Sequence, residues 1–148
     1  MNRKNKTHVP DISYFRLSLM DFLKESHPEL LKDRRFIISC ADAATEAYRQ
    51  AISEGDTPIE ASERANAVLF RNLHFSKHDT LVNILWNEFA NEIPEENAID
   101  LAITLLPECE QVFAGYPLSD GFACEPEYDL LYTELTGAIA LYIESHGI

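Results

Sequence analysis

Two histidines four residues apart, His74 and His78, stand next to a carboxylate, Asp79. On a continuous helix this spacing places both imidazoles on one face, where they could bind zinc or iron. Ser76, however, is followed three positions later by an acidic residue, which is typical of a helix N-cap. His74 would then precede the helix and His78 would lie in its first turn. We therefore expect a packed or capping His78, keep these three residues as weak metal candidates, and predict no cofactor.

The sequence lacks the other motifs that commonly carry catalysis. It contains neither the Gly-x-Ser-x-Gly pattern of hydrolases nor the glycine-rich patterns that cradle phosphates. No histidine stands in a Glu-x-x-His pattern, which diiron helix bundles use. The cysteines have no basic sequence neighbours to lower the pKa of a thiol; they are Cys40, Cys109 and Cys124. We predict no catalytic residue and favour a function other than catalysis.

Charge is divided unevenly along the chain. All twelve Lys and Arg residues lie in the first 77 positions, ending at Lys77, while residues 78–148 contain fourteen Asp and Glu. The first 77 residues therefore carry a net charge of +1 and the remainder −14. A pI near 4.6 argues against a partner that is nucleic acid or an anionic membrane, since both attract basic surfaces. The acidic half favours a basic partner instead.

Three functions remain open at this point. The first is a helical interaction or accessory module whose acidic half binds a basic protein; the weak contact candidates are Glu92, Glu95, Glu96 and Asp100. The second is an acidic mimic of DNA that inhibits a DNA-binding protein. The third is a small-molecule or metal-binding protein with a pocket between helices, lined for example by His74, His78 or Trp86. A homo-oligomer is compatible with all three.

Apolar residues recur at helical spacing throughout the chain, and no segment alternates as a strand would. The pattern predicts six helices, at about 13–26, 34–54, from 58, 76 to before 94, from 94 with a kink or restart at Pro107, and 126–145. Thr57 to Glu60 is a capping box with proline at the first helical position. The second and third helices should form an αα-hairpin turned at Gly55, with alanines on their facing sides.

These elements predict an all-α bundle, compact and single-domain over residues 13–148, behind a flexible basic arm at 1–12. The last helix has apolar residues on more than one face, with Leu130 and Leu141 opposite its main stripe. Such a helix is typical of a central, largely buried position or of an interface. No secretory signal or stretch of about 18 apolar residues is visible, and three cysteines form no paired framework. We therefore expect a cytoplasmic protein.

Several segments together resemble one family; they are Ser26 to Leu30 (SHPEL), Ala41 to Ala44 (ADAA), Leu73 to Val82, Leu85 to Phe89 (LWNEF) and Tyr128 to Thr136 (YDLLYTELT). The family consists of small helical proteins from Bacteroidales grouped as a domain of unknown function, often found on conjugative or other mobile elements. The resemblance covers nearly the whole chain from about Ser13. It implies an all-helical fold and a cytoplasmic bacterial protein, and it transfers no catalytic or binding residues to this chain.

Overall fold

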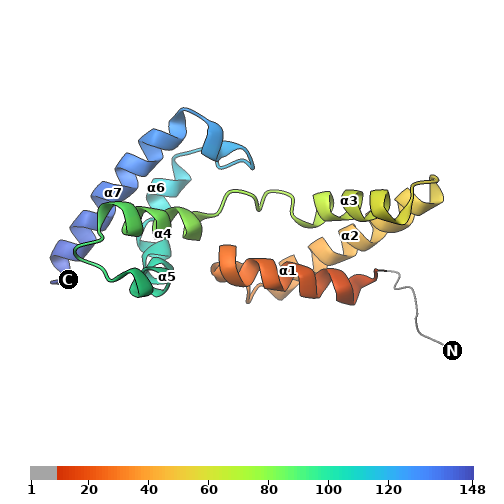
Figure 1. The fold of residues 1–148 in the computed structure, drawn as a ribbon, viewed down its shortest axis with the longest axis horizontal. Helices are drawn as coiled ribbons and strands as arrows, with labels where there is room; N and C mark the ends of the chain where they lie inside the picture. Colours follow the sequence, from red (N-terminus) through yellow and green to blue (C-terminus); the bar gives the residue numbers. More distant parts are fainter. Residues whose placement is uncertain (1–9) are drawn as a thin grey trace. The chain divides into compact units, whose positions relative to one another are not determined.

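The computed structural model describes residues 10–148, and in this range the chain is all-α with no strand. The residues predicted to form a flexible arm, 1–12, lie largely outside the described part, which reaches the first helix after Pro10 and Asp11. Figure 1 shows the seven α-helices in chain order. They are α1 (Ile12–Ser26), α2 (Arg34–Ser53), α3 (Pro58–Leu69), α4 (Lys77–Glu88), α5 (Ala98–Glu108), α6 (Glu110–Ala114) and α7 (Glu127–Ser145).

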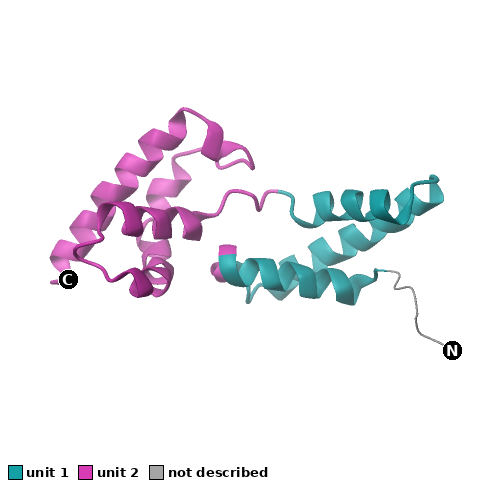
Figure 2. Ribbon diagram, in the orientation of Figure 1, with its two compact units in different colours: residues 1–25, 30–71 teal, residues 26–29, 72–148 magenta. Residues whose placement is uncertain are grey.

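The chain divides into two compact units (Figure 2). Unit 1 comprises Met1–Glu25 and Leu30–Arg71, and unit 2 comprises Ser26–Glu29 and Asn72–Ile148. The short segment 26–29, which carries part of the 3-10 helix Pro28–Leu30, thus belongs with residues that follow it by some fifty positions. Whether the two units fold as the one domain predicted from the sequence stays a prediction.

Unit 1 is organised by the predicted αα-hairpin of α2 and α3. Asp33 starts α2 by accepting a hydrogen bond from the Phe36 N–H at 3.1 Å. The capping box at the start of α3 is present in both directions, since Thr57 and Glu60 each bond the other's backbone N–H. Gly55 turns the chain at φ +98°, a conformation that costs other residues a Cβ clash.

The hairpin packs through small side chains, as its sequence predicts. Fully buried alanines from both helices allow the backbones to approach closely; they are Ala41, Ala44, Ala51, Ala61 and Ala65. Helix α1 buries Phe15, Leu19 and Leu23. The rings of Phe22 and Phe70 pack edge to face, with their centroids 5.1 Å apart. Ile52, next to the buried Ala51 near the end of α2, is exposed.

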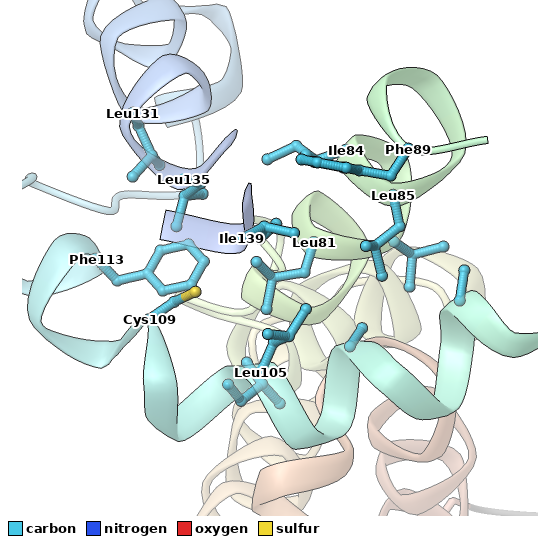
Figure 3. Close-up of a cluster of buried hydrophobic side chains, with 14 of the residues drawn as sticks. Leu81, Ile84, Leu85, Phe89, Leu105, Cys109, Phe113, Leu131, Leu135 and Ile139 are labelled. Carbon is cyan, nitrogen blue, oxygen red and sulfur yellow. The ribbon is translucent and has the colours of Figure 1, made fainter. Parts of the chain in front are cut away.

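Unit 2 is built around an apolar core to which α4, α5, α6 and α7 all contribute (Figure 3). Ser76 caps α4 as predicted, with its hydroxyl accepting from the Asp79 N–H at 2.9 Å. Pro107 occupies the last turn of α5, and the chain restarts as α6 after Cys109, as the missing proline N–H requires. The loop between α6 and α7 contains the short 3-10 helix Phe122–Cys124. Its Phe122 is fully buried and holds this loop against the core.

The fifth helix begins later than the sequence predicts, and Trp86 lies at the surface. The fifth helix was expected to open at Pro94, but Glu95–Asn97 form a 3-10 turn and α5 begins at Ala98. Trp86, named above as an example of a pocket-lining residue, is 43% exposed, with its indole N–H donating to the Glu95 carbonyl at 3.1 Å. The indole can lie at the surface because this carbonyl satisfies its polar atom.

Helix α7 buries one apolar face and exposes the other. Its inner residues are Leu131, Leu135, Ile139 and Ile143. On the opposite side Leu130 is 61% exposed and Leu141 is 67% exposed. The prediction of a largely buried last helix therefore holds for the inner face, and the second apolar face is left in contact with solvent.

The two faces of α7 should respond very differently to truncation. We expect Leu135→Ala to lower the free energy of unfolding by about 3 kcal/mol, because the buried leucine leaves a cavity among the core side chains. Leu141→Ala, on the same helix but exposed, should change it by less than about 0.5 kcal/mol. Urea titration followed by circular dichroism measures both, and equal losses would contradict this division of α7.

The capping box should contribute measurably to unit 1. Thr57→Ala removes the hydroxyl that receives the Glu60 N–H and should cost about 1 kcal/mol of unfolding free energy. Ser62→Ala, within the body of α3, serves as the control and should cost nothing, because alanine is the better helix former there. Thermal and urea unfolding of both variants test this, and a Thr57 variant as stable as its control would refute it.

Candidate functional site

The polar features of unit 2 gather where Ser26–Glu29 meets the start of α4. Ser76 is the centre of this junction, because its hydroxyl donates to the Ser26 carbonyl while accepting the N-capping bond from Asp79. The Thr80 hydroxyl donates to the Ser76 carbonyl at 2.8 Å, which ties the first turn of α4 to its cap. Two of the segments that carried the family resemblance, SHPEL and the run from Leu73, thus meet in space.

His27 is buried in this junction, with 4% of its surface exposed. Its Nε2 lies 2.7 Å from the Leu73 carbonyl oxygen, and since a carbonyl only accepts, Nε2 carries the proton. Its Nδ1 lies 3.8 Å from a carboxylate oxygen of Glu29. Burial by itself lowers the pKa of His27, but the Glu29 carboxylate and the Leu73 carbonyl outweigh it, so the pKa is raised.

His78 repeats the arrangement on α4. It is 3% exposed, its Nε2 donates to the Ile99 carbonyl at 3.0 Å, and its Nδ1 lies 3.8 Å from a carboxylate oxygen of Asp79. This buried Nδ1 has no hydrogen-bond partner. The Asp79 carboxylate raises the pKa of His78 more than burial lowers it. In each histidine, therefore, Nε2 donates a hydrogen bond to a backbone carbonyl, and Nδ1, the nitrogen that titrates, faces a carboxylate.

The metal candidates His74, His78 and Asp79 differ in burial: His78 is buried, and the other two are exposed. His74 precedes α4 and is exposed, whereas His78 lies inside the helix and is buried, so the two do not share a helical face. The backbone N–H of His74 donates to Asp120, as does that of Asn72, which holds the loop before α4 against the loop before α7. Within residues 10–148 no three His, Cys, Asp or Glu side chains converge as metal ligands.

A shallow cleft of about 400 Å³ opens beside the same junction. It is lined by Glu29, Lys77, Leu106, Pro107 and Glu110. Lys77 is the only basic residue in unit 2, and its ammonium lies 3.4 Å from both carboxylate oxygens of Glu110 and 5.6 Å from the centroid of the Phe113 ring. Burial raises the pKa of Glu29, but the interactions with His27 and Lys77 lower it by more than burial raises it. The pKa of Glu29 is therefore depressed.

Sequence reasoning missed His27, Glu29 and Glu110 as members of this junction. Their local pattern does not indicate it, because the contacts that join His27 to Leu73 and Glu110 to Lys77 link residues distant in the chain. The signal that was available is Lys77 itself, the last basic residue of the sequence. A single lysine at the edge of an acidic half of the chain has many carboxylates with which it can pair. In the structure Lys77 pairs with Glu110 on α6.

The four acidic contact candidates lie at the start of α5 and the turn before it. Glu92, Glu95, Glu96 and Asp100 are all exposed. The bond from the Trp86 indole to the Glu95 carbonyl fixes this turn against the end of α4. The side chains of Ile99 and Ile103, on the same stretch of α5, are also exposed. The candidates thus form part of a mixed acidic and apolar surface rather than a purely charged one.

Two of the three thiols lie in surroundings that raise their pKa. Cys109 is buried, and burial together with Glu108 raises the pKa of its thiol to about 11. Cys40 is half-buried, and burial raises the pKa of its thiol. Cys124 is exposed, as a loop residue should be. A thiolate is the reactive form, so neither Cys40 nor Cys109 is activated by its surroundings.

Comparison with known families gives a match over residues 7–148 to the family described as Domain of unknown function (DUF1896). The chain belongs to this family. Its fold is also similar to the crystal structure of protein PG0816 from Porphyromonas gingivalis, with 44% sequence identity and a TM-score of 0.87, over 92% of this chain and 93% of that one. No curated protein matches the chain.

These similarities confirm the resemblance to a helical family with Bacteroidales members, and the all-α fold that it implied. The association with mobile elements stays a prediction. Among the described residues no helix has the length and apolar character needed to cross a membrane.

The two buried histidines should make stability depend on pH. A histidine whose folded pKa is raised contributes stability that is fully present below its unfolded pKa of 6.5 and is lost as pH rises through the folded value. We therefore expect the free energy of unfolding to fall between about pH 6 and about pH 8. Urea titrations across this range measure the slope.

Variants assign that slope to individual side chains. His27→Gln and His78→Gln should each reduce the pH dependence, and the double variant should nearly abolish it in this range. His74→Gln, at the exposed position, is the matched control and should keep the wild-type slope. If the double variant retains the full slope, the buried pair is not its source.

Proposed function

We propose that this protein is a helical interaction module whose unit 2 binds a basic protein. One observation carries the proposal: the division into compact units coincides with the division of charge. Unit 2 contains fifteen Asp and Glu residues and one basic residue, Lys77, whereas unit 1 has a net charge of +1. The single lysine is itself paired with Glu110, so no unpaired cation interrupts the negative field of this unit.

The surface that best suits a partner lies around the start of α5. We call it the acidic–apolar patch; it consists of Trp86, Glu92, Glu95, Glu96, Ile99, Asp100 and Ile103, all exposed. Protein interfaces commonly combine an aromatic or aliphatic centre, which supplies binding energy, with charges that orient the partner. The exposed indole and isoleucines would form that centre, and the carboxylates would attract Lys and Arg of the partner. Three unpaired cysteines favour the reducing cytoplasm as the place of this encounter.

Capture from a Bacteroidales lysate with the tagged full-length chain tests this function. We expect a basic protein, captured in stoichiometric amount and released as salt screens the charges. The patch variant combines Glu92→Gln, Glu95→Gln, Glu96→Gln and Asp100→Asn, and it should lose most of the capture. The control combines Asp21→Asn, Glu25→Gln, Asp42→Asn and Glu63→Gln, which removes the same charge from unit 1 and should retain it.

The outcomes separate the alternatives. Equal loss in both variants would mean that net charge alone attracts the partner and that the patch is not its site. Capture that does not respond to salt would contradict the acidic docking surface. If the captured protein binds DNA, and DNA displaces it from this chain, the DNA-mimic function replaces the general interaction module.

A further inference from the structure

Unit 1 carries a small apolar groove with a cationic rim. It lies between α1 and the start of α2 and has a volume of about 170 Å³. Its lining residues are Arg16, Met20, Leu31, Arg34, Ile37 and Ile38. Ligand pockets usually enclose roughly 300–1,000 Å³, so this groove is too small for a typical metabolite. Its size suits a single aliphatic side chain presented by a protein.

The two rim arginines have no acidic partner. No ion pair or side-chain hydrogen bond involves Arg16 or Arg34 within residues 10–148, although unit 1 does pair other arginines, such as Arg64 with Glu54 and Asp56. Arg34 is also the first residue of α2, where the positive end of the helix dipole disfavours a cation. Helix stability therefore does not account for Arg34. An apolar floor with free guanidinium groups at its rim matches an aliphatic side chain flanked by carboxylates.

The outer face of α7 presents such a side chain. Leu130 is exposed, with Glu127 three residues before it and Glu134 four residues after it, so all three share one side of the helix. The carboxylate of Glu134 accepts a hydrogen bond from the Tyr116 hydroxyl, while Glu127 has no ion-pair partner among the described residues. Within this chain, the outer face of α7 thus supplies the chemistry that the groove would accept.

We propose that the groove of unit 1 receives Leu130 and its flanking carboxylates from α7 of a second copy of this chain. Each copy has one groove and one Leu130 face, so a two-fold symmetric pair makes the contact twice, once in each direction. Arg16 and Arg34 then meet Glu127 and Glu134, and the exposed leucine leaves water. This contact uses residues outside the acidic–apolar patch and is independent of the proposed function.

Sedimentation velocity on the full-length chain over a wide concentration range, at physiological salt, tests the proposal. Each copy has a mass of 16.8 kDa, and we expect the species at high concentration to have twice that mass. Physiological salt screens the repulsion between two acidic chains beyond about 8 Å while leaving close Arg–Glu contacts effective. Leu130→Ser and Arg34→Glu should each weaken association by about tenfold or more.

A charge exchange makes the test specific. Arg34→Glu and Glu127→Arg should each associate poorly alone, and mixing the two variants should restore a pair, because both contacts are then again between opposite charges. Arg34→Glu should fold normally, since glutamate is favoured at a helix start. Ile59→Ser removes an exposed apolar residue outside the groove and should leave association unchanged. A wild-type chain that stays monomeric, or a dimer that persists in Leu130→Ser and Arg34→Glu, overturns the proposal.

Discussion

The hydroxyl of Ser76 is the interaction on which unit 2 depends. It accepts the N–H that begins α4 and donates to the carbonyl of Ser26, a residue fifty positions earlier. One side chain thereby starts a core helix and holds the Ser26–Glu29 segment in unit 2. The chain consequently leaves unit 1 after α1, contributes four residues to unit 2, and returns to build the α2–α3 hairpin.

This arrangement explains why two histidines can be buried in a small acidic unit. Each hydrogen bond that a buried imidazole makes offsets part of the hydration that the ring loses on burial. The Leu73 and Ile99 carbonyls each accept a hydrogen bond from one nitrogen of a ring, and a carboxylate oxygen lies 3.8 Å from the other nitrogen, where Nδ1 of His78 has no hydrogen-bond partner. The junction therefore holds two buried imidazoles whose pKa values are raised.

The same unit must also tolerate a large excess of negative charge. Its carboxylates stand on α4, α5, α6 and α7 and in the turns between them, where solvent screens their mutual repulsion. The apolar core shared by these four helices opposes the repulsion that remains. Exposed Trp86, Ile99 and Ile103 lie among these carboxylates, so the surface of unit 2 around the start of α5 is both acidic and apolar.

The sequence by itself determined the helices, the capping box at Thr57, the Ser76 cap, the hairpin at Gly55, the restart at Pro107 and the acidic half. All of these depend on residues within a few positions of one another or on composition. The tertiary structure decided that His27 and Glu29 join His78, that Lys77 pairs with Glu110, and that Leu130 and Trp86 are exposed. Local spacing cannot reveal these features, because each arises from a contact, or from the lack of one, between segments distant in the chain, and only the packing of helices sets such distances.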